Sequence, residues 1–227
     1  MDISLKRRLL HLLYPTRCPV CGEVIRPKEH FCGRCREELR PFTGEFPIEG
    51  AEGFAAAFEY DEKVSPAVFL LKNGVCGNAA FALGGALAER LRTTSAQNSH
   101  VIVPVPLHKE ALRERGLDQS LLIAREVGRI LGIPVAEAVE KTTETLPQKT
   151  LSKAERQVNL CGAFTVSRPE AFAGKRVLLV DDVCTTGSTL AELTQVLKDA
   201  GAAAVYCCAC CKTPITEDRG ENDDGTR

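Results

Sequence analysis

The sequence contains no tryptophan, a single methionine and four histidines, and aromatic residues make up only 5% of its 227 positions. Net charge is nearly absent as well, because 29 basic residues are balanced by 30 acidic ones to give a formal charge of -1. A chain without bulk positive charge has no general electrostatic attraction to nucleic acids or anionic membranes. Any basic surface must therefore be local.

Long apolar runs are also missing. No stretch reaches the roughly 18 to 20 apolar residues that span a bilayer, and the start of the chain lacks the apolar core and small-residue cleavage site of a signal peptide. We therefore expect a cytoplasmic protein. The chain is nevertheless 44% hydrophobic, which is enough for one globular domain of ordinary size and a small module.

Apolar periodicity and turn residues predict a regular series of strands and helices. The predicted strands cover residues 54–60, 101–105, 134–139, 176–180 and 203–210, and the predicted helices cover 66–72, 79–92, 119–131 and 189–200. Strands that alternate with helices favour an α/β fold with a mostly parallel sheet flanked by helices.

Composition divides the chain into three segments. We expect an N-terminal helix and a cysteine-rich module within residues 1–45, a main domain at 54–214 and a disordered tail at 215–227, where apolar residues are almost absent. The Pro-, Gly- and Glu-rich stretch at 42–53 is interpreted as a connector. The first helix, over 5–13, is short and carries three charges, so packing on the body is favoured over anchoring at a membrane surface.

The most informative segment begins with the apolar run of residues 177–180, which predicts a central strand buried on both faces. Asp181 and Asp182 follow where ligands gather in open α/β sheets, at the carboxyl end of a strand. The next residues, 185–189, place four hydroxyls around a glycine and open a helix, an arrangement suited to phosphate. Paired carboxylates suit the neighbouring hydroxyls of a ribose, so the segment predicts a ribose-5-phosphate site. The alternative is a plain strand, turn and helix in which Thr and Ser only cap.

Two polar stretches carry side chains that can bind anions. The first leaves the strand at 101–105, passes His108 and delivers arginines beside a glycine, whereas the second could close over the site as a lid. Their candidate pyrophosphate and lid residues are Arg113, Arg115, Gln119, Gln148, Arg156 and Asn159. The alternative for each stretch is a solvated connector, and the same holds for a proton-transfer role of His108.

The segment 177–189 resembles the signature of phosphoribosyltransferases that use phosphoribosyl pyrophosphate (PRPP). This resemblance implies that Asp181 and Asp182 contact the ribose hydroxyls and that Mg²⁺ bridges pyrophosphate and ribose oxygens. It also implies that the 5′-phosphate is bound by Thr185, Thr186, Gly187, Ser188 and Thr189.

Taken in order along the chain, the segments 103–119, 145–159 and 177–189 resemble the ComF family, which acts in natural competence, the uptake of single-stranded DNA. More distantly they resemble amidophosphoribosyltransferases. The chain departs from the family pattern in having Leu117 and Asp118 where Phe-Asn is usual. The negative charge of Asp118 makes the first polar stretch a weaker candidate for binding an anion.

The resemblance leaves three functions open. The chain could transfer a phosphoribosyl group to an acceptor with loss of pyrophosphate, or it could bind PRPP or a nucleotide only as a sensor or scaffold with a competence-machinery partner. The third alternative is a nucleobase-salvage or amidophosphoribosyltransferase-like enzyme. Because the acids and hydroxyls of residues 181–189 are all present, we expect ligand binding under each of the three functions. Their presence does not show whether the bound ligand also reacts.

Four cysteines near the N-terminus form two Cys-x-x-Cys pairs, Cys18 with Cys21 and Cys32 with Cys35, ten residues apart. This spacing lets four thiolates meet at one tetrahedral Zn²⁺, and four protein ligands make the site structural. Thioredoxin-like redox activity is the alternative. His30 lies near the second pair, but the cysteines already complete the site.

The cysteine module has a weak case for binding DNA, because residues 1–40 hold nine basic and five acidic side chains and no interleaved aromatic platform. Docking on the main domain or on a protein partner is favoured. A second cluster, residues 207–211, could also hold metal, but its place in an apolar strand favours buried cysteines that act as small hydrophobes.

Overall fold

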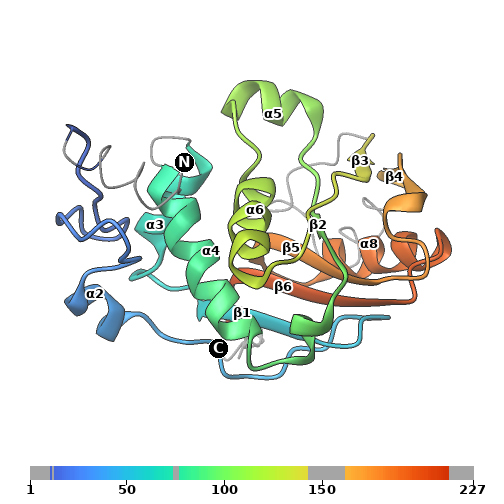
Figure 1. Cartoon of the computed structure of the whole chain (residues 1–227), viewed down its shortest axis with the longest axis horizontal. Coiled ribbons are helices and arrows are strands. Elements are labelled where there is room, and N and C mark those ends of the chain that lie inside the picture. Colours follow the sequence, from blue (N-terminus) through green and yellow to red (C-terminus); the bar gives the residue numbers. More distant parts are fainter. Residues whose placement is uncertain (1–10, 12, 74–76, 143–161, 215–227) are drawn as a thin grey trace, which may run out of the picture.

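A parallel sheet of four strands lies at the centre of the computed structural model, which describes residues 11, 13–73, 77–142 and 162–214. The strand order is β1-β6-β5-β2, and each neighbouring pair is parallel. The strands are β1 (Phe54–Glu59), β2 (Val101–Pro104), β5 (Arg176–Cys184) and β6 (Ala204–Lys212). The expected α/β fold is therefore confirmed (Figure 1).

Helices cover both faces of this sheet. On one face lie α3 (Ser65–Lys72), α4 (Gly77–Leu91) and α6 (Gln119–Leu131), and on the other lies α8 (Ser188–Asp199) (Figure 1). Strand β5 serves both layers, because Leu178 packs with the first group of helices and Leu179 with α8. Alternate side chains of a strand point to opposite faces, so a continuous apolar run is required here.

Helix α6 has the predicted bounds because strong signals mark both of its ends. The side chain of Asp118 accepts a hydrogen bond from the Leu121 backbone N–H, which caps the first turn. The helix ends at Gly132, whose φ of 74° is a left-handed conformation that glycine adopts without strain.

The predicted strand at 134–139 is wrong. Only Val135 forms an isolated bridge, with Ile102 of β2, and regular pairing begins later in β3 (Val139–Lys141). The predicted segment begins with a proline, which has no backbone N–H to donate to a sheet. Strand β3 instead pairs antiparallel with β4 (Phe164–Val166), which the sequence pattern did not reveal, in a separate two-stranded sheet.

The first polar stretch is not an irregular loop, since residues Lys109–Arg115 form helix α5. The ring of His108 accepts a hydrogen bond from the Glu110 N–H at the start of α5, and Gly116, with φ of 71°, ends it. The remaining short helices are α2 (Gly33–Glu38), η1 (Ser95–Asn98) and η3 (Pro169–Ala171). Among the described residues, no helix combines the length and apolar character needed to cross a membrane.

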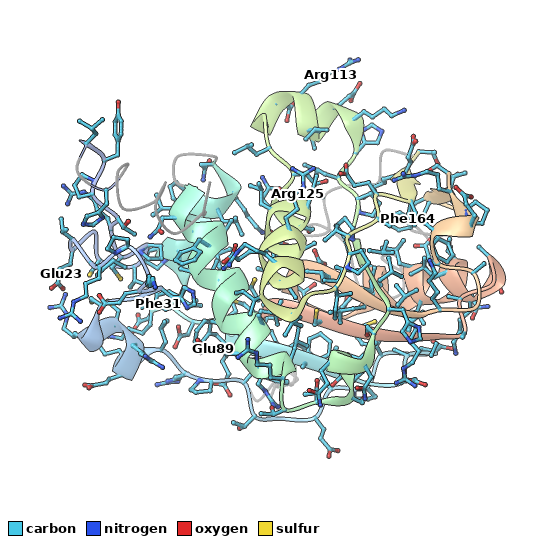
Figure 2. The ribbon with its side chains drawn as sticks, in the orientation of Figure 1. Glu23, Phe31, Glu89, Arg113, Arg125 and Phe164 are labelled. Carbon is cyan, nitrogen blue, oxygen red and sulfur yellow. The ribbon has the colours of Figure 1, made fainter. Side chains whose placement is uncertain are left out.

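The cysteine module docks on the main domain, as expected. The ring of His30 meets Phe81 of α4 edge-on at a centroid distance of 4.6 Å. The ring of Phe31, which is labelled in Figure 2, meets Phe58 of β1 at 5.7 Å. Cys32 and other buried residues of the module belong to the same apolar core as α3 and α4. The helix predicted at 5–13 and the tail predicted at 215–227 lie mostly or wholly outside the described residues.

Candidate functional site

Asp181 and Asp182 lie at the carboxyl end of β5 but inside the strand, because β5 continues beside β6 as far as Cys184. On the other side of β5, pairing with β2 ends at Pro104 and Val180. The two acids therefore stand just beyond the end of β2. A sheet edge of this kind, where one strand runs past its neighbour at the carboxyl ends, is where α/β folds place ligands.

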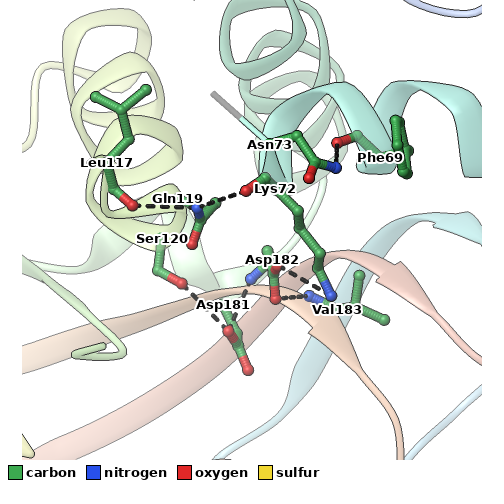
Figure 3. A network of polar contacts seen from close by, with 9 residues as sticks. All are labelled: Phe69, Lys72, Asn73, Leu117, Gln119, Ser120, Asp181, Asp182 and Val183. Atoms are coloured by element: carbon green, nitrogen blue, oxygen red, sulfur yellow. Dashed lines mark hydrogen bonds and ion pairs between the residues drawn. The ribbon is translucent and has the colours of Figure 1, made fainter. Parts of the chain in front are cut away.

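The carboxylate of Asp181 accepts two hydrogen bonds. The Ser120 hydroxyl at the start of α6 donates to Oδ1 over 3.2 Å, and the Asp182 backbone N–H donates to the same oxygen over 2.8 Å (Figure 3). Burial, and after it the negative charge of Asp182, raises the pKa of Asp181 to about 7. The pair can thus change its total charge near neutral pH.

Asp182 is held by a cation. The Lys72 ammonium at the end of α3 lies 3.5 Å from Oδ2, and the Val183 N–H donates to Oδ1 over 2.7 Å. The Gln119 side-chain amide donates to the backbone carbonyls of Lys72 and Leu117, so it fastens the end of α3 to the start of α6 (Figure 3). Three elements far apart in the sequence therefore meet at the paired acids.

The turn after β5 has the geometry of an anion site. Gly187 has φ of 80° and stands at the N-terminal end of α8, where it offers no capping side chain to the first helical turn. The hydroxyls of Thr186 and Ser188 lie 2.9 Å apart. The Ser188 N–H donates to the Thr186 hydroxyl over 3.5 Å, and α8 directs the positive end of its dipole at this hydroxyl-rich turn, an arrangement that suits phosphate.

The connector at residues 42–53 packs against this turn at Gly187. A Cβ atom at Gly187 would lie 2.5 Å from the Ile48 side chain and 2.9 Å from the Phe46 ring. Such distances are too short for any side chain larger than hydrogen, so glycine is required by close packing as well as by its φ. Residues 42–53 are therefore part of the support of the site.

The four N-terminal cysteines can hold a zinc ion. Their Sγ atoms all lie within 4.8 Å of one another, and those of Cys21 and Cys32 are 3.6 Å apart. Tetrahedral zinc with Zn–S bonds of about 2.3 Å requires sulfur atoms roughly 3.8 Å apart. A backbone hydrogen bond at Glu23 lowers the pKa of Cys21 to about 7, whereas burial raises that of Cys35, so the ion's charge would stabilise the buried thiolates.

Comparison with known proteins follows the same division of the chain. Residues 9–48 match the double zinc ribbon domain, and residues 116–225 match the phosphoribosyl transferase domain. The DNA utilization protein YhgH of Escherichia coli strain K12 is 34% identical over 203 residues, which cover 87% of this chain and 85% of that protein. Competence protein F of Haemophilus influenzae is 32% identical over 195 residues, covering 83% and 81%. The chain belongs to the ComF family.

Solved phosphoribosyltransferases are more distant from this ComF-family chain. The glutamine PRPP amidotransferase from Bacillus subtilis is 25% identical, with a TM-score of 0.39 over 56% of this chain and 25% of that one. The orotate phosphoribosyltransferase from Aeropyrum pernix is 19% identical, with a TM-score of 0.35 over 77% and 76%.

The polar stretches of the ComF-family chain are only partly placed at the paired acids. Gln119 is buried in the network beside them, but Arg113 is exposed on α5 and points away from the body (Figure 2). Arg115 is the last residue of α5. The lid candidates Gln148, Arg156 and Asn159 lie outside the described residues.

Asp118 has a structural role that the sequence interpretation missed. Its carboxylate caps α6 by accepting a hydrogen bond from the Leu121 N–H, and burial raises its pKa above the ordinary aspartate value. The carboxylate thus holds the first turn of α6 in place.

Three further polar residues of the site were missed. Ser120 and Lys72 hold the acids, and Lys141 of β3 lies near enough to Asp181 and Glu192 for their charges to act on it, while burial lowers its pKa. The only sequence signal for Lys72 was its position before Asn-Gly, which ends α3. Nothing in the local pattern links any of the three to β5, because their proximity arises from the sheet topology.

The cysteines of the second cluster lie in the interior of β6 and are buried. Cys207 packs in the layer of α8 and Cys208 in the layer of α4 and α6, so neighbouring thiols face opposite ways. Among the described residues, the four N-terminal cysteines are the one group of three or more His, Cys, Asp or Glu side chains that lie close enough together to hold a metal ion. This agrees with the interpretation of the second cluster as core.

Proposed function

We propose that this ComF-family chain binds PRPP through its ribose-5-phosphate half at the carboxyl end of β5. The observation that carries the proposal is the direct succession of paired acids, hydroxyl-rich turn and helix N-terminus in one rigid segment. Asp181 and Asp182 would accept hydrogen bonds from the ribose hydroxyls, and the turn at 185–189 would donate to the 5′-phosphate.

Both acids are held by neighbouring side chains. Ser120 donates to Asp181 and Lys72 pairs with Asp182, so both carboxylates are held in position before binding. Such preorganisation lowers the entropy cost of binding. Lys72 is half-exposed at the rim and would remain beside the bound anion, and Mg²⁺ would supply the positive charge that neutralises the pyrophosphate group.

Turnover would proceed by displacement at the anomeric carbon. An acceptor nucleophile would form a bond to that carbon while the bond to pyrophosphate breaks, and the protein would contribute mainly by positioning and charge stabilisation. If no acceptor reacts, the same site serves as a sensor of PRPP or a nucleotide.

The names of the relatives, which refer to competence and DNA utilization, support a proposal about the biological setting. We propose that the chain acts in the cytoplasm in natural competence, where ligand binding is linked to the handling of incoming single-stranded DNA. The zinc module, docked on α4, would present its outer surface to a protein of the competence machinery.

Isothermal titration calorimetry with PRPP and Mg²⁺ tests the binding site. The double variant Asp181→Asn with Asp182→Asn keeps the size of both side chains but removes their charge, and we expect it to weaken binding at least about tenfold. Asp199→Asn is the matched control, because it removes an exposed carboxylate at the far end of α8. No binding by the unmodified protein, or equal binding by the double variant, would refute the site.

Pyrophosphate release then separates an enzyme from a sensor. The protein that binds PRPP is incubated with Mg²⁺ and each of a panel of nucleobases and amines, and free pyrophosphate is measured. Release that depends on both an acceptor and the two acids supports transfer, whereas tight binding without release supports sensing.

A further inference from the structure

Lys212 is a buried lysine that contacts the first residue of the proposed phosphate turn, 185–189. It is the last residue of β6, only 3% of its surface is exposed, and it pairs in register with Cys184, the last residue of β5. The turn at 185–189 begins at the next residue of the chain. The lysine is thus anchored to the same strand end from which the turn departs.

The ammonium group of Lys212 reaches the turn. It donates a hydrogen bond to the Thr185 carbonyl over 2.8 Å and another to the Thr213 carbonyl over 2.5 Å. On another side it lies 4.2 Å from the centre of the Phe46 ring, whose face attracts cations. A cavity of about 240 Å³, lined by Lys212, Phe46, Glu45 and Glu59 among others, adjoins it.

The charge of this group lacks a full counterion in the described part of the chain. Its titratable neighbours are the Cys184 thiol of β5, the register partner Glu59 of β1 and Glu45 of the connector, and neither carboxylate forms an ion pair with it. Burial raises the pKa of Cys184 to about 12, so this thiol is neutral at physiological pH. Two carbonyls and a ring compensate a buried ammonium only in part.

We propose that Lys212 is the buried cation of the phosphate site: it holds the turn through the Thr185 carbonyl and supplies positive charge from behind. This inference rests on the proposed function and adds a positioning residue to it. A phosphate dianion in the turn would be the missing counterion. The site would consequently favour ligands with a 5′-phosphate over the corresponding ribosides.

The connector takes part in the same arrangement. Phe46 lies against both the Lys212 ammonium, which bonds the first residue of the turn, and Gly187 in the middle of the turn. The stretch between the zinc module and the main domain therefore belongs to the structure that holds the phosphate.

Calorimetry in buffers of different ionisation enthalpy tests the inference, because it measures both affinity and proton uptake. Burial lowers the pKa of Lys212, and a bound anion raises it again. When the unmodified protein binds PRPP and Mg²⁺, we therefore expect proton uptake by Lys212 that grows as the pH of the titration is raised toward the ordinary lysine pKa of about 10.4.

Two variants separate charge from structure. Lys212→Met keeps much of the side-chain volume without the charge, and we expect an affinity loss of about tenfold or more and no proton uptake. Lys212→Arg keeps the charge but does not titrate, so we expect it to retain more affinity than Lys212→Met while losing the uptake. Lys175→Met, which removes a lysine whose ammonium bonds the Ala171 carbonyl, is the control and should change neither quantity.

The outcomes are distinguishable. Equal affinity and equal proton uptake in Lys212→Met overturn the inference and leave the proposed function intact, whereas failure of the unmodified protein to bind PRPP refutes the proposed function itself. If Lys212→Met does not fold, as judged by circular dichroism, Lys212→Arg decides: proton uptake that persists in this variant overturns the inference.

Discussion

At the scale of single residues, β5 is a buried apolar strand that carries two polar residues, Asp181 and Asp182, near its end. The side chains from Val177 to Val180 are buried. The next side chains, the two carboxylates, are partly exposed because β2 ends beside Val180. The Asp181 carboxyl is kept partly protonated by burial and by its neighbour, and Ser120 and Lys72 offset part of that penalty. In the folded protein, the ionised form of Asp181 is therefore disfavoured by burial and by the charge of Asp182. A ligand that brings hydroxyl groups and a metal ion would relieve this effect.

Because the ionised form of Asp181 is disfavoured in the folded protein, we predict that the free energy of unfolding depends on pH. The folded-state pKa of Asp181, about 7, lies above the ordinary aspartate value, so the folded state binds its proton more tightly than the unfolded state does. The contribution of Asp181 to stability is therefore full at low pH and is lost as pH rises toward 7.

Asp181→Asn should remove this dependence. We expect the variant to be more stable than the unmodified protein at pH 8 and to lose most of that advantage near pH 5, as measured by urea unfolding at both values. Asp199→Asn serves again as the control, because its carboxylate is exposed. A stability difference that is the same at both values of pH would contradict the assignment.

At the scale of elements, helix α4 is built to receive the cysteine module. A Cβ atom at Gly85 would lie 2.3 Å from the His30 ring, which is itself fixed against Phe81. Glycine inside a helix normally lowers its stability, so the close approach of a neighbouring ring gives it a physical reason here. The same ring lies 3.9 Å from the Glu89 carboxylate, one turn further along α4.

Gly85→Ala should push the module away from α4. We expect a loss of about 1 to 3 kcal/mol in the free energy of unfolding, because the ring of His30 has little room to move. In a His30→Ala background the clash is absent, and the same change should be neutral or stabilising, since alanine favours helix. Denaturant unfolding of the two single variants and the double variant measures the coupling, and additive effects would refute the close contact.

Sequence reasoning succeeded at this scale where a signal was local. The apolar periodicity of residues 119–131 gave the bounds of α6, and the run at 177–180 identified the central strand. It failed at α5, whose few residues carry no apolar face, and at β3 and β4, which are three residues long and gain their stability from each other. For the candidate site, the sequence predicted the contiguous segment 181–189, and its role as a binding site stays a prediction. Lys72, Ser120 and Lys212 were not linked to that segment, because only the topology brings them there.

At the scale of the whole molecule, the zinc module and the main domain share one apolar core. Buried residues of the module, among them Cys18, Phe31 and Leu39, form a single cluster with α3, α4 and one face of the sheet. The end of α3 in turn supplies Lys72 to the paired acids. The four-cysteine site and the candidate site at the paired acids are therefore connected by continuous packing, although they lie in different parts of the sequence.

This shared core predicts that zinc stabilises the whole chain and not the module alone. Zinc binding adds its free energy to folding, and elements that share a core unfold together. Chelation, or Cys32→Ser, should thus lower the midpoint of a single thermal transition that includes the parallel sheet, with metal content falling in parallel. Cys210→Ser is a matched control, because that thiol is buried in β6 away from the metal group and should leave the metal content unchanged. Two separate transitions, with the upper one unaffected by zinc, would show that the module folds independently.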